Sequence, residues 1–184
     1  MRSQSQERIL IGGVGYHWCG DGSWGLQAVE TLSQQEWPSG VEFGQLDYGA
    51  IYVSQELAAA KPPYSAIVFL SAVERDREPG RVYGYSWQPR ILEIEELQSR
   101  IREAGAGVID LEHLLAIAQH FGALPKDTRI IEFEPADLST GTELSPAGKA
   151  AIAAASALLR EFIPNALEGS GTWEAGSVGR ARGN

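Results

Sequence analysis

The segment ILIGGVGYHWCGDGSWGLQAVETL, residues 9–32, contains the transitions that decide the fold. Arg8 to Gly12 holds a short apolar run that stops at glycines, which favours a buried strand because the run is too short for a helix. After a glycine-rich loop, Leu26, Val29 and Leu32 recur at helical spacing. The segment therefore predicts a strand, a loop and then a helix.

Outward from this segment, strands and helices alternate along the chain. Further strands are predicted at 41–46, 65–70, 82–87 and 128–134, and helices at 25–35, 54–60, 91–104, 111–121 and 146–162. Residues 65–70, SAIVFL, are an uninterrupted apolar run, which is typical of a strand covered on both faces. The alternation predicts a three-layer α/β fold, with a mostly parallel central sheet, helices on both faces and one antiparallel edge strand.

Two of the helices have clear start signals. Asp110 is suited to cap the helix of 111–121, on which His113 and His120 fall opposite the leucine stripe and are expected to face solvent. Ser145 and Pro146 open an alanine-rich helix. The residues of this helix expected to face inward are Ile152, Ala155, Ser156 and Leu159.

Length and composition bound the organisation of the chain. The 184 residues are the usual size of one domain, and we expect a single α/β domain over 1–167 followed by a flexible tail, rich in Gly and Ser, over 168–184. No leader sequence or apolar stretch of 18 residues is apparent, so we expect a cytoplasmic protein that does not enter a membrane.

Charge and cysteine content narrow the classes of partner. The chain has 15 Lys and Arg against 24 Asp and Glu, a net charge of −9, which disfavours nucleic acid and anionic membranes because both would repel it. Cys19 is the single cysteine, so no disulfide forms within one chain. We therefore expect a protein partner.

In a parallel sheet, ligands bind in the loops at the carboxyl ends of the strands, here 12–24, 47–50 and 71–80. Gly13 and Gly15 suggest a dinucleotide fingerprint, but Trp18 stands where its third glycine belongs. Asp47 also lies too far along the chain to be the acidic residue of that fingerprint. The loops therefore disfavour nucleotide binding, and they assign no catalytic serine or cysteine.

The motifs in these loops follow a familiar order. After the glycine-rich segment 12–25 come LDYG at 46–49, a central strand with its exit REPGRV at 77–82, and IEFEPAD at 131–137. This order, over residues 8–163, resembles the hydrogenase maturation endopeptidases. The resemblance implies a monomeric α/β protein that recognises nickel in the immature large subunit of a nickel–iron hydrogenase and removes a C-terminal extension.

The resemblance also implies three metal ligands, and this chain departs from that set. Asp21 matches the acidic residue just before the first ligand, but the ligand position is Gly22. The second position falls at Glu74, and the third falls near Ala106 or Gly107, where there is no histidine. Because divalent transition metals need three or four convergent donors, we expect a degenerate site with no permanently bound cofactor, and nickel only as part of the substrate.

A rearranged metal site is the alternative. His17, Cys19 and Asp21 alternate along the first loop, and an extended segment would point them to one side, toward Glu74. These donors suit zinc or nickel. Alternatively, His17 is a partly buried polar residue, Cys19 a small core side chain and Asp21 an anion at a helix N-terminus.

Two loop tryptophans complete the candidate site. Trp24 is expected in the core, whereas Trp18 is a candidate exposed anchor for a partner protein. Three functions follow: a chaperone-like binding factor for a hydrogenase large subunit or related metalloenzyme subunit, an active metal-dependent endopeptidase with rearranged ligands, or an unrelated small-ligand or protein-binding module on the same fold.

Overall fold

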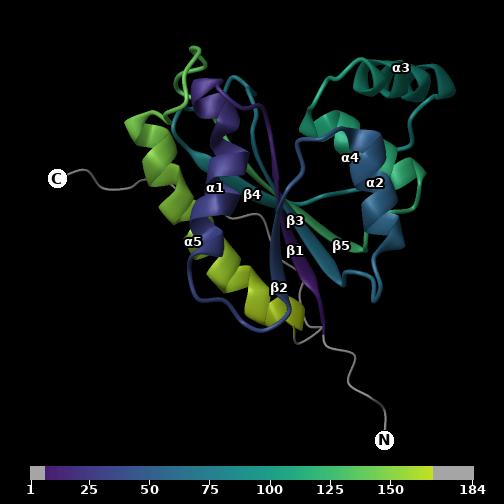
Figure 1. The fold of residues 1–184 in the computed structure, drawn as a ribbon, viewed down its shortest axis with the longest axis horizontal. Helices are drawn as coiled ribbons and strands as arrows, with labels where there is room; N and C mark the ends of the chain where they lie inside the picture. Colours follow the sequence, from purple (N-terminus) through teal and green to yellow (C-terminus); the bar gives the residue numbers. More distant parts are fainter. Residues whose placement is uncertain (1–6, 168–184) are drawn as a thin grey trace, which may run out of the picture.

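The computed structural model describes residues 7–167, which form a five-stranded sheet with helices on both faces (Figure 1). The strand order is β2-β1-β3-β5-β4. Three neighbouring pairs are parallel, and β4 is antiparallel to β5 at one edge. The predicted fold class is thereby confirmed. The strands are β1 Ile9–Val14, β2 Val41–Gln45, β3 Ala66–Ala72, β4 Val82–Ser86 and β5 Asp127–Phe133.

The helices divide between the two faces of the sheet. In Figure 1, α1 and α5 lie on one side, and α2 and α4 lie on the other with α3 packed beyond them. A short 3₁₀ helix, η1, precedes α1. The bounds are η1 Gly20–Ser23, α1 Trp24–Ser33, α2 Ala50–Ala59, α3 Ile94–Gly105, α4 Leu111–His120 and α5 Pro146–Leu167.

The central strand β3 explains why both faces are covered. Its side chains alternate between two cores: Val68 and Leu70 face the core under α1 and α5, whereas Ile67 and Phe69 face the core under α2 and α4. Fully burying side chains of this size stabilises the fold by about 1.5–3 kcal/mol each. The apolar run at 65–70 therefore joins two cores through one strand.

The helix boundaries differ most from the sequence-based ranges in α2 and α5. α2 begins at Ala50, four residues before the predicted start at Ser54, and α5 continues to Leu167 rather than ending at Phe162. Ser156 is only half-buried, because its hydroxyl lies at the surface and donates to Gln35 Oε1 at 3.0 Å. Ile152, Ala155 and Leu159 are buried as predicted.

Helix α5 corrects the expectation that the chain has no long apolar stretch. Within residues 7–167, it is the one helix long and apolar enough to cross a membrane by length and composition. Its alanines produce this result, and its larger residues pack under the sheet in the core beside α1. A core helix on a sheet has the same composition, so α5 needs no membrane to explain it. The predicted tail at 168–184 lies outside the described residues.

Candidate functional site

The glycine-rich loop that follows β1 is fixed against the segment after β5. Gly20 N–H donates to Gly141 O at 3.0 Å, and Gly141 N–H donates to Trp18 O at 3.1 Å. Gly20 has a φ of +49°, and a Cβ there would lie 2.9 Å from the carbonyl oxygens of Asp137 and Ser139. Only glycine fits this close approach, so the loop is held against the segment that follows β5.

Asp21 is the buried centre of this attachment. Its side chain is fully buried and accepts four hydrogen bonds. Oδ2 accepts from Ala136 N, Asp137 N and Ser145 Oγ at 2.9, 3.1 and 2.8 Å, and Oδ1 accepts from Ser145 N at 2.9 Å. The prediction of Asp21 as a metal ligand is therefore wrong, because both oxygens are already bonded and water cannot reach them. The alternative, an anion at a helix N-terminus, matches its place at the start of α5.

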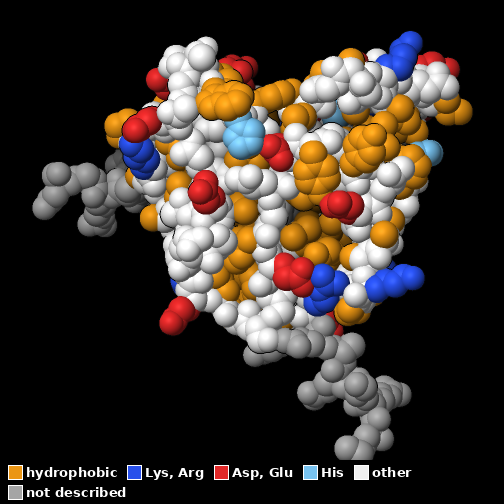
Figure 2. Space-filling model, in the orientation of Figure 1, with side chains coloured by type: hydrophobic (Ala, Val, Ile, Leu, Met, Phe, Trp, Pro, Cys, Tyr) orange, Lys and Arg blue, Asp and Glu red, His pale blue; other side chains and the backbone are white. Residues whose placement is uncertain are grey.

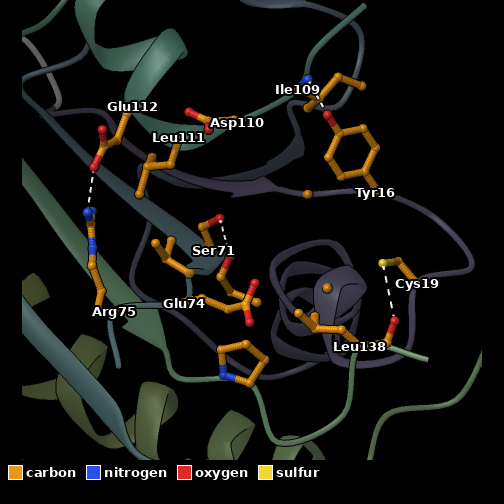
Figure 3. Close-up of a pocket in the computed structure, with 15 residues that line it drawn as sticks. Tyr16, Cys19, Ser71, Glu74, Arg75, Ile109, Asp110, Leu111, Glu112 and Leu138 are labelled. Atoms are coloured by element: carbon orange, nitrogen blue, oxygen red, sulfur yellow. Dashed lines mark hydrogen bonds and ion pairs between the residues drawn. The ribbon is translucent and has the colours of Figure 1, made fainter. Parts of the chain in front are cut away.

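A cleft of about 440 Å³ opens at the carboxyl ends of β1, β3 and β5 (Figure 3). The glycine-rich loop, the exit of β3, the start of α4 and the segment after β5 form its walls. Figure 3 shows the Glu74 carboxylate inside the cleft, between Tyr16 and Arg75. The lining residues are Gly15, Tyr16, Cys19, Gly22, Ser71, Ala72, Val73, Glu74, Arg75, Ile109, Asp110, Leu111, Glu112, Pro135 and Leu138.

Two residues at the ligand positions implied by the resemblance lie in this cleft. Glu74 and Gly22 both line it. A Cβ added at Gly22 would lie 2.9 Å from Cys19 Sγ, so the thiol occupies the space that a side chain at position 22 would need. Cys19 lines the cleft rather than lying in the core, and its side chain is half-buried. The first ligand position is thus filled by a neighbouring thiol.

The predicted third position, near Ala106 or Gly107, does not line the cleft. Gly107 follows the end of α3 with a φ of +93° and does not line the cleft. The residues of this segment that do reach the cleft are Ile109 and Asp110. The Tyr16 hydroxyl accepts from Ile109 N–H at 2.7 Å and so joins the first loop to the start of α4. The predicted third position, near Ala106 or Gly107, therefore supplies no side-chain donor to the cleft.

The four residues proposed as a rearranged metal site are not brought together. His17 is half-exposed outside the cleft, and its Nε2 lies 2.7 Å from Asp47 Oδ2. Of the four, only Cys19 and Glu74 line the cleft. Within residues 7–167, no group of three or more His, Cys, Asp or Glu side chains is placed to hold a metal ion. The donors present do not fit a resident transition metal, which needs three or four of them.

A buried carboxylate, Glu132, pairs with two arginines at the rim of the cleft. No pattern in the sequence indicated this role. Glu132 is 1 % exposed, and it binds Arg75 at 3.0 Å, Arg77 at 2.8 Å and the Tyr85 hydroxyl at 2.7 Å. Arg75 also binds Glu112 at 2.5 Å. The hydrogen bond that Arg75 donates to Glu132 raises the pKa of Arg75, and burial together with the hydrogen bond that Tyr85 donates to Glu132 raises the pKa of Tyr85. The rim arginine is therefore held in one orientation.

His113 is buried between α3 and α4, so its predicted solvent exposure is wrong. Its Nε2 lies 2.7 Å from Glu103 Oε2 on α3, and its Nδ1 lies 2.9 Å from Asp110 Oδ1. The Asp110 carboxylate caps α4 as predicted, accepting from His113 N at 2.9 Å. Burial would lower the pKa of His113, but the two carboxylates outweigh it and raise that pKa. His120 is exposed as predicted.

This histidine gives the stability a predictable pH dependence. Because its folded pKa is raised, the contribution of His113 is fully present below the unfolded value of about 6.5 and is lost as pH rises through the folded pKa. The difference in unfolding free energy between the wild type and His113→Gln should be larger at about pH 6 than at about pH 9. Urea unfolding at the two pH values measures it, with His120→Gln as the exposed control. A difference that grew with pH would contradict the assignment.

The tryptophans lie as predicted. Trp24 is fully buried, and its indole N–H donates to Gly148 O at 3.1 Å. Trp18 is 70 % exposed and has a φ of +56°, which is uncommon for a residue with a side chain. Figure 2 shows hydrophobic side chains gathered at the top of this face, near the carboxyl ends of the strands. The exposed aromatic residues of this loop are Tyr16 and Trp18.

The fold is similar to that of proteins of known structure. No family model and no curated protein matches the sequence. Among solved structures, a hydrogenase 2 maturation peptidase from a Thaumarchaeota archaeon is 29 % identical, with a TM-score of 0.57, over 85 % of this chain and 98 % of its own. The hydrogenase maturating endopeptidase HybD from E. coli is 24 % identical, with a TM-score of 0.58, over 84 % of this chain and 93 % of its own. The resemblance predicted from the motifs is confirmed.

Proposed function

The chain is a hydrogenase maturation protease-like protein, and from this premise we propose that it binds the large-subunit precursor of a nickel–iron hydrogenase in the cleft without a metal ion of its own. The observation that carries the proposal is the content of the cleft. Of the three ligand positions that the resemblance implies, Gly22 has no side-chain donor, Gly107 does not line the cleft, and Glu74 alone supplies a donor.

The remaining polar groups in the cleft have other partners. Asp110 caps α4 and pairs with His113, and Glu112 pairs with Arg75. Burial would raise the pKa of Asp110, but its bonds to His113 lower that pKa. This carboxylate is therefore charged at neutral pH and already paired with His113. Glu74 and Cys19 are too few donors for a resident transition metal. Nickel therefore belongs to the substrate in this proposal, and Glu74 is the side chain placed to meet it.

The shape of the cleft suits an extended polypeptide. It is open to solvent, and its polar groups are joined by apolar walls from Leu111, Ile109 and Leu138. Trp18 does not line the cleft, but it lies in the same loop between Tyr16 and Cys19, which do, and it exposes a large rigid side chain of the kind that dominates binding energy in protein interfaces. We assign Trp18 as the anchor for the precursor, which the protein holds as a cytoplasmic monomer with a chaperone-like role.

Binding of a purified large-subunit precursor tests the proposal. The wild type should form a complex on size-exclusion chromatography, and Trp18→Ala should weaken it about 30-fold, since losing an anchor of this kind costs about 2 kcal/mol. Phe121→Ala is the matched control, because Phe121 is also exposed but lies at the carboxyl end of α4, away from the cleft. Equal binding by Trp18→Ala and the wild type would remove Trp18 from the interface, and no complex at all would overturn the proposal.

A further inference from the structure

A second hollow of about 350 Å³ adjoins the cleft, and we call it the arginine pocket. It lies between α4, the start of α3 and the segment that follows β4. It shares Arg75, Leu111 and Glu112 with the cleft, so the two hollows adjoin, with the Arg75–Glu112 ion pair at their common boundary. The lining residues are Arg75, Tyr85, Ser86, Trp87, Gln88, Arg90, Leu92, Arg100, Leu111, Glu112, Leu115, Ala116, Gln119 and Ile130.

The floor and the rim of the arginine pocket differ in chemistry. Leu111, Leu115, Ala116 and Ile130 are buried and form an apolar floor. Arginines from three separate segments of the chain stand around it, Arg75, Arg90 and Arg100, with Glu112 as the single acidic lining residue. Arg75 and Arg100 are paired with glutamates, so the uncompensated positive charge at this rim belongs to Arg90. An apolar floor below arginines suits a ligand that is both apolar and anionic.

The three arginines differ in whether their guanidinium groups are already paired with carboxylates. Arg75 is held by Glu112 and Glu132, and Arg100 donates from Nε and Nη2 to Glu96 Oε1 at 3.2 and 2.9 Å. Arg90 is bound only through its backbone: its N–H donates to Gln119 Oε1 at 3.1 Å, and its carbonyl accepts from Gln119 Nε2 at 2.7 Å. Among residues 7–167, no side chain pairs with its guanidinium. The backbone of Arg90 is therefore fixed while its charge is unused.

We propose that the arginine pocket binds an acidic peptide segment, with an aliphatic side chain on the apolar floor and a carboxylate on Arg90. Arg100 is paired with Glu96 and its Nη1 lies 3.8 Å from Glu112 Oε2, so Arg90 supplies the uncompensated charge. A polypeptide lying in the cleft would reach the arginine pocket by crossing the Arg75–Glu112 pair, which both hollows share. The source of the segment, the polypeptide held in the cleft, rests on the proposed function, whereas the chemistry of the pocket does not.

A peptide of defined chemistry tests the pocket without the precursor. The probe is a fluorescein-labelled pentapeptide of alternating leucine and glutamate, blocked at both ends, and its comparison is the same peptide with glutamine for glutamate. Fluorescence anisotropy should show the acidic peptide binding at least about 10-fold more tightly, the value of one charge-assisted hydrogen bond. Arg90→Gln should abolish this preference. Arg102→Gln is the matched control, an exposed arginine of α3 that does not line the pocket.

The outcomes separate this inference from the proposed function. Equal binding of the two peptides, or an unchanged preference in Arg90→Gln, overturns the acidic-peptide assignment even if a precursor complex forms. A preference that Arg90→Gln abolishes supports the arginine pocket even if no precursor complex forms. Added salt should weaken the acidic peptide more than the glutamine peptide, because exposed charges are screened.

Discussion

Replacing Asp21 with asparagine will lower the free energy of unfolding by about 2–4 kcal/mol, because hydrogen bonds to a charged group are worth about 1.5–3 kcal/mol each and several are weakened at once. All four partners of Asp21 donate: three backbone N–H groups and the Ser145 hydroxyl. The amide nitrogen of an asparagine would have to face one of these donors, so one buried N–H group would lose its acceptor.

Urea unfolding at neutral pH measures the effect of Asp21→Asn. Asp47→Asn is the matched control, because Asp47 also lies in a loop at the sheet edge but pairs only with the half-exposed His17. Its loss should cost less than about 1 kcal/mol, the usual value of an exposed pair. If Asp21→Asn were as stable as the wild type and instead lost affinity for zinc or nickel, Asp21 would be a metal ligand rather than the buried attachment point of the loop.

A second large effect is expected where α1 meets the sheet. A Cβ at Gly25 would lie 2.3 Å from Leu70 O and 2.5 Å from Val14 O, both of which are backbone atoms of the two central strands. Because a backbone cannot move aside like a flexible side chain, Gly25→Ala must push α1 away from β1 and β3. We expect a loss of about 3 kcal/mol or more, above the usual range for overpacking.

Thermal and urea unfolding of Gly25→Ala test this expectation. Gly105→Ala is the matched control: Gly105 is also helical, but nothing lies within 4 Å of an added Cβ. That control should be neutral or slightly stabilising, since alanine favours helices over glycine by up to about 1 kcal/mol. A Gly25→Ala protein as stable as the wild type would show that α1 does not pack as closely as described.

Much of the fold could be predicted from local pattern. The run at 65–70 predicted a strand covered on both faces, and Asp110 and Ser145 predicted helix starts that the structure confirms. These features depend on residues close together in the sequence. Gly25 is a different case: its place in a glycine-rich motif was visible, but the reason for it lies in the backbone of β3, which only the folded chain brings near.

The site was less predictable than the fold, because its contacts join residues that are far apart in the sequence. The partners of Asp21 lie 115 to 124 residues away, so no spacing in the first loop distinguishes a buried hydrogen-bond acceptor from a metal ligand. His113 looked solvent-facing because helical periodicity describes one packing face, whereas α3 covers a second. Glu74 and Cys19 were placed at the cleft correctly, since both lie at the carboxyl ends of predicted strands.

The arrangement of the cleft gives the glycine-rich loop two roles. Gly20 lets the loop approach the segment after β5, and Gly22 leaves room for the Cys19 thiol at a position where the resemblance implies a metal ligand. The first role preserves the architecture of a maturation protease, and the second removes a donor from it. The proposed function therefore separates binding of a polypeptide from its cleavage, and it rests on the missing side-chain donor at Gly22.

Incubation with a nickel-loaded large-subunit precursor, followed by intact-mass measurement of both proteins and a metal count of this one, separates binding from cleavage. We expect a complex in which the precursor keeps its full mass and this protein, recovered from it, carries no stoichiometric nickel or zinc. Loss of a C-terminal fragment from the precursor, together with one tightly bound metal ion per chain that Glu74→Gln or Cys19→Ser removes, would contradict binding without cleavage and establish an active endopeptidase with a rearranged site.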